Sequence, residues 1–517
     1  MTRAAPGWRR LAALLVLCAA TTTAGPSARA VPEETSHLTG VRALRRAYDA
    51  ALNASFEEAA AHLDDACGPA PPEACLVLDA TRLWWRILLD PYDTSRDAEF
   101  LARVEEAIAA CERWTEREPG RAEAWFYLGG AYGARVSWRV QRGQRLAAAR
   151  DGKRIKEALE EALTIAPGMA DARFGIGLYK YYADVAPAFA RFLRVLLLLP
   201  GGDRAAGLAD MEAAREDGLL VTGEADYQLH WIYLWYEDAP EAAMAALERL
   251  HARYPRNPHF LQRIAEVRQE YFHDPAGSLA AWQTLVNRAS QMGTPGIART
   301  RGELGVAAQL DRLFETDRAV ELLERVIARA PRKPAEALAL AHVQLGEALA
   351  RLGDADRARA EFRAALDAVP DDLDALEDRA RDGLRRRPDP RTGHAYRIGL
   401  EGWRLYERGR VADAIERLSH AVEQAPELAM TRARLGRALA ASGDDERALA
   451  ELNAVIAGRA TAPPVAVTAA YLWSGAVFEE RGDRHAAAER YREATHVFGG
   501  DSRLVAEARR ALARVSQ

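Results

Sequence analysis

The chain has 517 residues, of which 28% are charged and 49% hydrophobic, and its formal net charge is −5. This composition is ordinary for a soluble globular protein. A mildly acidic chain has no general electrostatic attraction for nucleic acid, and no segment after the first thirty residues is apolar enough to cross a membrane as a helix. We therefore expect no nucleic-acid partner, and no transmembrane span once those thirty residues are removed.

Residues 1–30 have the features of an export signal. Three arginines lie among the first ten residues, residues 11–20 are mainly apolar, and residues 28–30 form a small-x-small cleavage site. The apolar stretch is about half the ~20 residues that a membrane-spanning helix needs. We expect cleavage after Ala30 and a periplasmic or secreted chain. A membrane or lipid anchor, with the lipid on Cys18, and a cytoplasmic protein are the alternatives.

Residues 31–121 have the hydrophobic periodicity of divergent helical repeats. Within them Cys67 and Cys75 flank a turn-rich segment of sequence Gly-Pro-Ala-Pro-Pro-Glu-Ala. In an oxidising compartment this short spacing favours a local disulfide, and two free thiols are the alternative. Cys111 belongs to an apolar helical pattern, so we expect it to be a small core residue.

Residues 122–223 form a degenerate repeat region with insertions. The helix that should pair with the one around Trp125 is displaced by about fourteen residues, so we expect the insert to lengthen both helices. Further on, the run Val185–Leu199 is almost entirely apolar. It has three interpretations, which are a buried core helix, a hydrophobic pocket for a ligand or partner, and a helix at a membrane surface.

A 34-residue period runs through the C-terminal half of the chain. A small residue recurs at a fixed distance before a large apolar residue, and a proline often follows. The recurring positions are Gly346, Phe362, Ala365 and Pro370, then Gly402, Leu418, Ala421 and Pro426, then Gly436, Ala448 and Leu452, then Gly475, Tyr491 and Ala494. A small residue lets two helix backbones approach, a large residue fills the gap between them, and proline ends the second helix.

This pattern resembles the tetratricopeptide repeat, a pair of helices that close around small residues. The resemblance implies an all-α fold, a right-handed superhelical α-solenoid of helix-turn-helix repeats. The predicted segments are a signal peptide at 1–30, divergent N-terminal helical repeats at 31–121, a degenerate repeat region at 122–223, repeat-like pairs at 224–333, a repeat at 339–372, a charged linker helix at 373–394, repeats at 395–428, 429–462 and 468–500, and a capping helix at 501–517.

The chain lacks the residue patterns of the common catalytic and metal sites. Its eleven histidines are scattered, with no zinc-binding spacing, and its serines lie in no nucleophile motif. We therefore expect a protein that is not an enzyme and that uses neither a metal nor a cofactor.

In tetratricopeptide proteins the first helix of each pair lines the concave surface, so the resemblance implies a groove there. The family's groove positions fall in this chain on Arg301, Tyr396, Trp403, Tyr406 and Arg437. Trp403 and Tyr406 are candidates to anchor a peptide. The alternative is that both rings only pack between neighbouring helices.

The resemblance and the missing reactive groups together predict a function. We expect a non-enzymatic exported scaffold that binds a protein or peptide in the cell envelope. The alternative is a periplasmic ligand-binding accessory subunit of a small-molecule uptake system, with its pocket at the apolar run.

Overall fold

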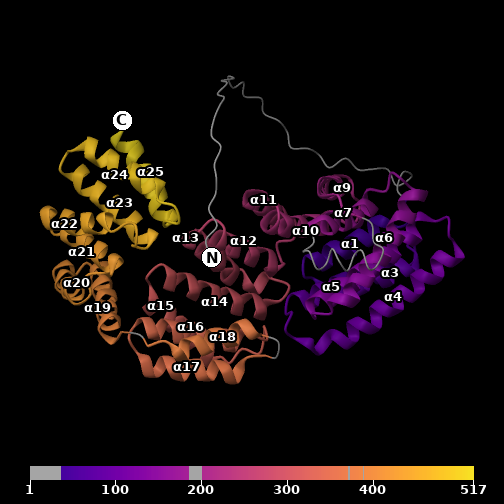
Figure 1. Ribbon diagram of the computed structural model, residues 1–517, viewed down its shortest axis with the longest axis horizontal. Coiled ribbons are helices and arrows are strands. Elements are labelled where there is room, and N and C mark those ends of the chain that lie inside the picture. The colour runs from indigo at the N-terminus through magenta and orange to yellow at the C-terminus, as the bar shows by residue number, and fades with distance from the viewer. Residues whose placement is uncertain (1–36, 186–200, 371–372, 388) are drawn as a thin grey trace. The chain divides into compact units, whose positions relative to one another are not determined.

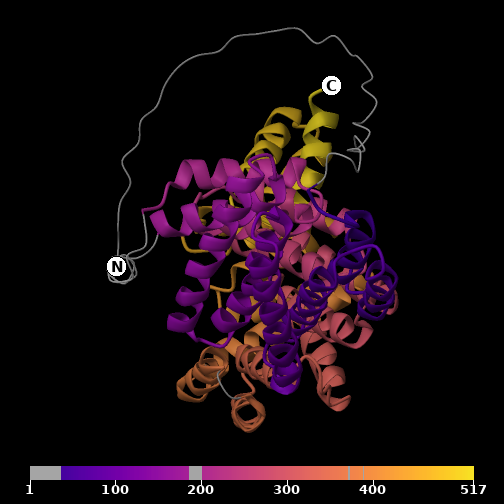
Figure 2. The same ribbon diagram turned by 90° about the vertical axis from the view of Figure 1, so that its right-hand side faces the viewer.

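The computed structural model describes residues 37–185, 201–370, 373–387 and 389–517. Within these ranges the chain forms 24 α-helices and two short 3₁₀ segments without any β-strand (Figure 1; Figure 2). None of these helices is both long and apolar enough to cross a membrane. The predicted all-α fold is confirmed. The predicted signal at 1–30 and residues 186–199 of the apolar run lie outside the described ranges.

Successive helices pack against each other in pairs, which can be followed along the chain in Figure 1. The first five pairs are α1 (Val41–Leu52) with α2 (Phe56–Ala66), α3 (Pro72–Leu88) with α4 (Asp97–Arg117), α5 (Ala122–Gln141) with α6 (Arg145–Ile165), α7 (Ala170–Val185) with α9 (Arg204–Asp217), and α10 (Thr222–Trp235) with α11 (Pro240–Arg253). The 3₁₀ segment η2 (Thr94–Arg96) precedes α4.

The remaining six pairs continue to the C-terminal part of the chain. They are α12 (Pro258–Glu270) with α13 (Pro275–Asn287), α14 (Pro295–Arg312) with α15 (Thr316–Ala328), α16 (Ala337–Arg351) with α17 (Ala355–Ala368), α19 (Pro390–Glu407) with α20 (Val411–Gln424), α21 (Ala429–Ala441) with α22 (Asp445–Ala457), and α23 (Pro464–Glu480) with α24 (Arg484–His496). The 3₁₀ segment η3 (Ala289–Gln291) precedes α14, α18 (Asp374–Arg385) lies in the predicted charged linker, and α25 (Ser502–Val515) packs on the last pair.

The repeated glycines lie where the two helices of a pair cross. A Cβ atom on Gly475 would lie 2.7 Å from the Tyr491 ring, and one on Gly346 would lie 2.7 Å from the Phe362 ring. Both distances are shorter than a carbon–carbon contact allows, so these crossings have room for glycine alone. Tyr491 and Phe362 are themselves 1% and 2% exposed. The 34-residue period therefore reflects one packing arrangement, which recurs in the pairs that begin with α16, α19, α21 and α23.

The turn inside a C-terminal pair depends on glycine followed by aspartate. Gly443 and Gly482 have positive φ angles of 81° and 80°, which cost little only when no Cβ is present. The next residues, Asp444 and Asp483, cap the second helix by accepting hydrogen bonds from the backbone N–H groups of Arg447 and Ala486. A Gly-Asp pair thus ends one helix and starts the next.

The insert after Trp125 lengthens the pair that contains it, as expected from the sequence. Helices α5 and α6 have 20 and 21 residues, against 13 residues in each of α21 and α22. Arg135 on α5 holds Asp151 on α6 through two hydrogen bonds of 3.0 and 2.7 Å, and both side chains are buried. A buried ion pair therefore joins the extended parts of the two helices.

Candidate partner-binding surface

Three aromatic rings from α19 and α23 form a stack, which we call the aromatic stack: Tyr406, Trp403 and Trp473. The ring centroids of Trp403 and Tyr406 are 4.9 Å apart, with 15° between the ring planes. Those of Trp403 and Trp473 are 5.8 Å apart, at 28°. All three side chains are half-buried, so each ring packs on its neighbour and keeps part of its area accessible. The two sequence-based interpretations, anchor and packing, are therefore compatible.

Helix α21, between α19 and α23 in the chain, contributes an arginine that packs on this stack. Arg434 is buried, with its guanidinium carbon 5.1 Å from the centroid of the Trp403 ring. Its Nη2 donates a 2.8 Å hydrogen bond to the carbonyl oxygen of Phe314. Burial lowers the pKa of Arg434 to about 10, so the group is still charged at neutral pH. A buried cation on an aromatic face fixes the position of the Trp403 ring.

Arg437 lies three residues further along α21 and is half-buried. Within the described ranges it forms no hydrogen bond or ion pair, whereas most arginines around it are paired. Arg404 on α19, for example, holds Asp317 at 2.7 Å and Glu407 at 2.8 Å. Arg437 is thus a half-buried cation on α21 that is available for an anionic group.

Tyr396 was predicted to line the groove, but the structure places it inside the protein. Its side chain is 4% exposed, and its hydroxyl is 2.8 Å from Oγ1 of Thr316 on α15. Phe314 also packs edge-on against it, with ring centroids 6.5 Å apart. The turn between α14 and α15 covers this position, so Tyr396 supports the surface from below and does not face a partner.

Arg301 is also separate from the aromatic stack. Its guanidinium donates to Glu336 at 3.1 Å and to Gln262 at 3.3 Å, and its side chain is 10% exposed. These bonds link α14 to α12 and to the start of α16. Of the five predicted residues, the structure brings Trp403 and Tyr406 together and gives Tyr396 and Arg301 structural partners. Arg437 lies on α21 without an ion pair among the described residues.

Sequence reasoning missed Trp473 and Arg434. Both stand at the sixth position of their repeats, which begin at 468 and 429. The groove residues predicted in the repeats that begin at 395 and 429 stand at positions 2, 9 and 12. The available signal was that the same repeat position holds an arginine in one repeat and a tryptophan in the next. Their contact with Trp403 depends on how three helices pack, which spacing within one repeat does not define.

The structure joins the sulfur atoms of Cys67 and Cys75 in a disulfide across the turn between α2 and α3. Cys111 is buried and unpaired, and burial raises the pKa of its thiol to about 12. No group of three or more His, Cys, Asp or Glu side chains that could hold a metal ion occurs among the described residues.

These features define an α-solenoid of stacked helix pairs, with an aromatic stack on first helices and the buried Arg434 against it. Two family models, both of the tetratricopeptide repeat, match residues 339–372 and 405–469. The chain is therefore a protein with tetratricopeptide repeats. The matched residues include the Gly346 crossing, Tyr406 and all of α21.

Solved structures of tetratricopeptide proteins are similar to parts of the chain. One from Parabacteroides merdae has 14% identity and a TM-score of 0.27, and the match covers 57% of this chain and 99% of that one. A thermophilic protein from Thermus thermophilus has 24% identity and a TM-score of 0.23, with 42% of this chain and 98% of that one covered. YrrB, described as having an unusual peptide-binding site, has 19% identity and a TM-score of 0.20, with 45% and 99% covered. Comparison with curated proteins found no match.

Proposed function

We propose that this protein is a non-enzymatic scaffold that binds a peptide segment of a partner protein on the aromatic stack. The observation that carries the proposal is the stack itself, in which Tyr406, Trp403 and Trp473 form a row of half-buried rings. The few residues that contribute most of the binding energy at protein interfaces are enriched in tryptophan, tyrosine and arginine. Here the rings come from the first helices of two pairs, and Arg437 belongs to the first helix of the pair that lies between them in the chain.

The chemistry of the surface suggests what the peptide carries. An apolar or aromatic side chain can pack on the accessible ring area of the stack. A carboxylate, from an acidic side chain or a C-terminus, can pair with Arg437, and such charge-assisted bonds are about twice as strong as neutral ones. The ligand we propose is therefore a segment that combines a large apolar side chain with a nearby carboxylate.

Selection from a displayed peptide library, followed by calorimetry with the enriched peptide, tests this proposal. We expect Trp403→Ala with Tyr406→Ala to weaken binding by about 2 kcal/mol or more, the scale of interface hot spots. Arg437→Gln leaves the stack intact. We therefore expect it to weaken the binding of peptides that carry the carboxylate and to leave the binding of their amide analogues unchanged. Trp235→Ala removes a tryptophan that is 59% exposed on α10 and serves as the control.

Thermal melting of the same variants separates a binding role from a packing role. If the rings serve only as core, the double alanine variant should lose several kcal/mol of stability, as large-to-small core substitutions do. Normal melting with lost binding supports the proposal. Unchanged binding to a well-folded double variant would contradict it.

We also propose that the scaffold works in the cell envelope after export. The arginines, the apolar stretch and the Ala-Arg-Ala site of residues 1–30 support this proposal. The intact mass of the protein from a native envelope fraction should correspond to a chain that begins at Val31. A mass that includes residues 1–30, or a lipid on Cys18, would contradict cleavage after Ala30.

A further inference from the structure

The end of α10 exposes two aromatic side chains next to each other. Trp235 is 59% exposed and Tyr236 is 40% exposed. Among the described residues, six large hydrophobic side chains are exposed, and these two are the only consecutive ones. Tyr236 packs edge-on against Tyr181 and Tyr182, with ring centroids 5.9 and 5.8 Å apart, so its position is fixed. Tryptophan and tyrosine exposed side by side are typical of a surface that contacts another protein.

The exposed Trp235 ring belongs to a stack that already contains a cation. Its ring centroid is 4.2 Å from that of Trp231, with 38° between the ring planes, and Trp231 is half-buried. The guanidinium carbon of Arg263, on α12, is 4.1 Å from the centroid of the Trp231 ring. A guanidinium on an indole ring is a favourable cation–π contact. The half-buried ring thus holds a guanidinium already, and the exposed ring can offer the same contact to a partner.

The ends of α10 and α12 lie level with each other. The Tyr227 hydroxyl on α10 is 3.3 Å from Nε2 of His259 on α12, which is 32 positions further along the chain. Arg263 follows Trp231, on which it packs, by the same number of positions. The two helices therefore run parallel and in register. Glu270, the last residue of α12, is consequently level with the turn that follows α10.

Both helix ends carry carboxylates without an ion pair among the described residues. The four residues between α10 and α11 include Glu237 and Asp238 and no basic residue. Glu237 pairs with Arg204 at 2.8 Å, whereas Asp238 and Glu241 are exposed and form no ion pair within the described ranges. Glu270 is exposed and unpaired there as well. Carboxylates arranged beside exposed rings complement a partner that is cationic.

The helix ends add to this preference for a cation. The last carbonyl groups of α10 and α12 carry partial negative charge. Loss of surrounding water and then the charge of Glu266 raise the pKa of Glu270, while Arg263 and Arg312 act in the opposite direction. A further cation beside Glu270 would offset the repulsion from Glu266.

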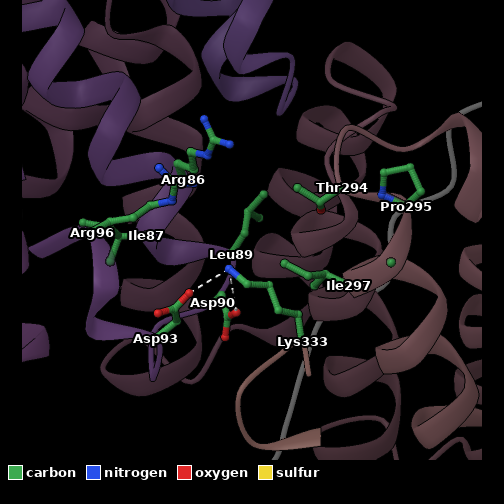
Figure 3. Close-up of a pocket in the computed structure, with 11 residues that line it drawn as sticks. Arg86, Ile87, Leu89, Asp90, Asp93, Arg96, Thr294, Pro295, Ile297 and Lys333 are labelled. Atoms are coloured by element: carbon green, nitrogen blue, oxygen red, sulfur yellow. Dashed lines mark hydrogen bonds and ion pairs between the residues drawn. The ribbon is translucent and has the colours of Figure 1, made fainter. Parts of the chain in front are cut away.

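The acidic turn after α3 shows the opposite situation, in which the chain supplies the cation itself. Figure 3 shows Lys333, from the connection between α15 and α16, beside Asp90 and Asp93. Its Nζ atom is 2.7 Å from Asp93 and 3.9 Å from Asp90. Within the described ranges, no lysine or arginine pairs in this way with Asp238 or Glu241, which leaves that role to a partner.

We propose that the ends of α10 and α12 bind an arginine-bearing segment of a partner protein. A guanidinium of the partner packs on the exposed ring of Trp235, in the way that Arg263 packs on Trp231. Further arginines of the segment pair with Asp238 and Glu270. Arginine suits this surface better than lysine, because its planar group both stacks on rings and binds carboxylates through two N–H groups. The proposal does not depend on peptide binding at the aromatic stack.

Fluorescence anisotropy with a labelled peptide tests this surface on the full chain. The probe is a blocked peptide with three arginines separated by glycines. In the matched control peptide each arginine is replaced by citrulline, which has nearly the same shape without the charge. We expect the arginine peptide to bind about tenfold more tightly than the citrulline peptide, or better. Equal binding of the two peptides, or no binding of the arginine peptide, would overturn the proposal.

Two variants place the binding at the ends of α10 and α12. Asp238 has a positive φ of 49°, which asparagine tolerates, so Asp238→Asn with Glu270→Gln should fold and should weaken binding about tenfold. Trp235→Leu keeps an apolar side chain but removes the ring, and it should weaken binding about threefold or more. Unchanged affinity in either variant, with circular dichroism unchanged, would overturn the proposal.

A matched control separates this surface from the negative charge of the whole chain. Asp93→Asn also removes one carboxylate, but Lys333 already pairs with that carboxylate, so the affinity for the arginine peptide should not change. An equal loss of affinity in Asp93→Asn and in the variants at Asp238, Glu270 and Trp235 would show general attraction to an acidic chain. That result would also overturn the proposal.

Discussion

At the scale of single residues, two buried histidines make the stability of the folded protein depend on pH. His230 and His259 are 0% and 8% exposed, and Tyr227 lies between them. Burial lowers the pKa of both, with that of His259 falling to about 3, and the positive charge of Arg263 contributes in each case. Both imidazoles are therefore neutral in the folded protein at neutral pH.

These lowered pKa values predict a loss of stability in mild acid. The unfolded chain takes up protons at pH values below about 6.5, whereas folded His259 does so only near pH 3. Stability is therefore complete above pH 6.5 and falls as the pH drops toward 3, by up to about 1.4 kcal/mol per pH unit for each histidine. Urea unfolding between pH 7.5 and 4.5 measures this slope. His259→Phe should reduce the slope, and an unchanged slope would contradict the role of His259.

The disulfide makes a second prediction at the residue scale. Cys67 and Cys75 are eight positions apart, and closing so short a loop stabilises the folded state by about 2–3 kcal/mol in the chain-entropy description. Peptide mapping without reduction should find the linked pair together with a free Cys111. Reductant should lower the melting temperature of the wild type but not that of Cys67→Ser with Cys75→Ser. Two thiols that alkylate freely in the native protein would contradict the pairing.

At the scale of helix pairs, the packing of the glycine at each crossing affects stability more than the low helix propensity of glycine does. Gly475→Ala places a methyl group against Tyr491, which should destabilise the protein by about 1–3 kcal/mol. Gly152→Ala also replaces a glycine within a helix, but it meets no neighbour, so it should stabilise by up to about 1 kcal/mol. Urea midpoints should therefore move in opposite directions. A shift of the same sign in both variants would show that propensity and not packing controls these positions.

Also at this scale, the sequence predicted the contacts within a helix pair but not the contacts between distant pairs. The spacing from Gly475 to Tyr491 shows a crossing directly, because both residues belong to one local unit. Tyr396 was misplaced because Phe314 and Thr316, about eighty positions earlier, cover it. Local periodicity contains no information on such contacts, and it missed Trp473 for the same reason.

At the scale of the whole molecule, contacts between distant pairs create the features that matter for binding. Arg434 reaches the carbonyl of Phe314 across 120 positions, and Lys333 reaches Asp93 across 240. The first contact supports the aromatic stack, and the second joins the connection between α15 and α16 to the turn after α3. A solenoid whose successive pairs contact only their neighbours would have neither feature.

We propose that the first helices of the C-terminal pairs form the partner-binding surface. Hydrogen–deuterium exchange of the full chain, with and without the selected peptide, is the decisive test, because it reports which helices the peptide protects. We predict slower exchange in α19, α21 and α23, around Trp403, Arg437 and Trp473, and little change in α20, α22 and α24. Protection confined to α20, α22 and α24, or to helices outside the C-terminal pairs, would contradict the claim.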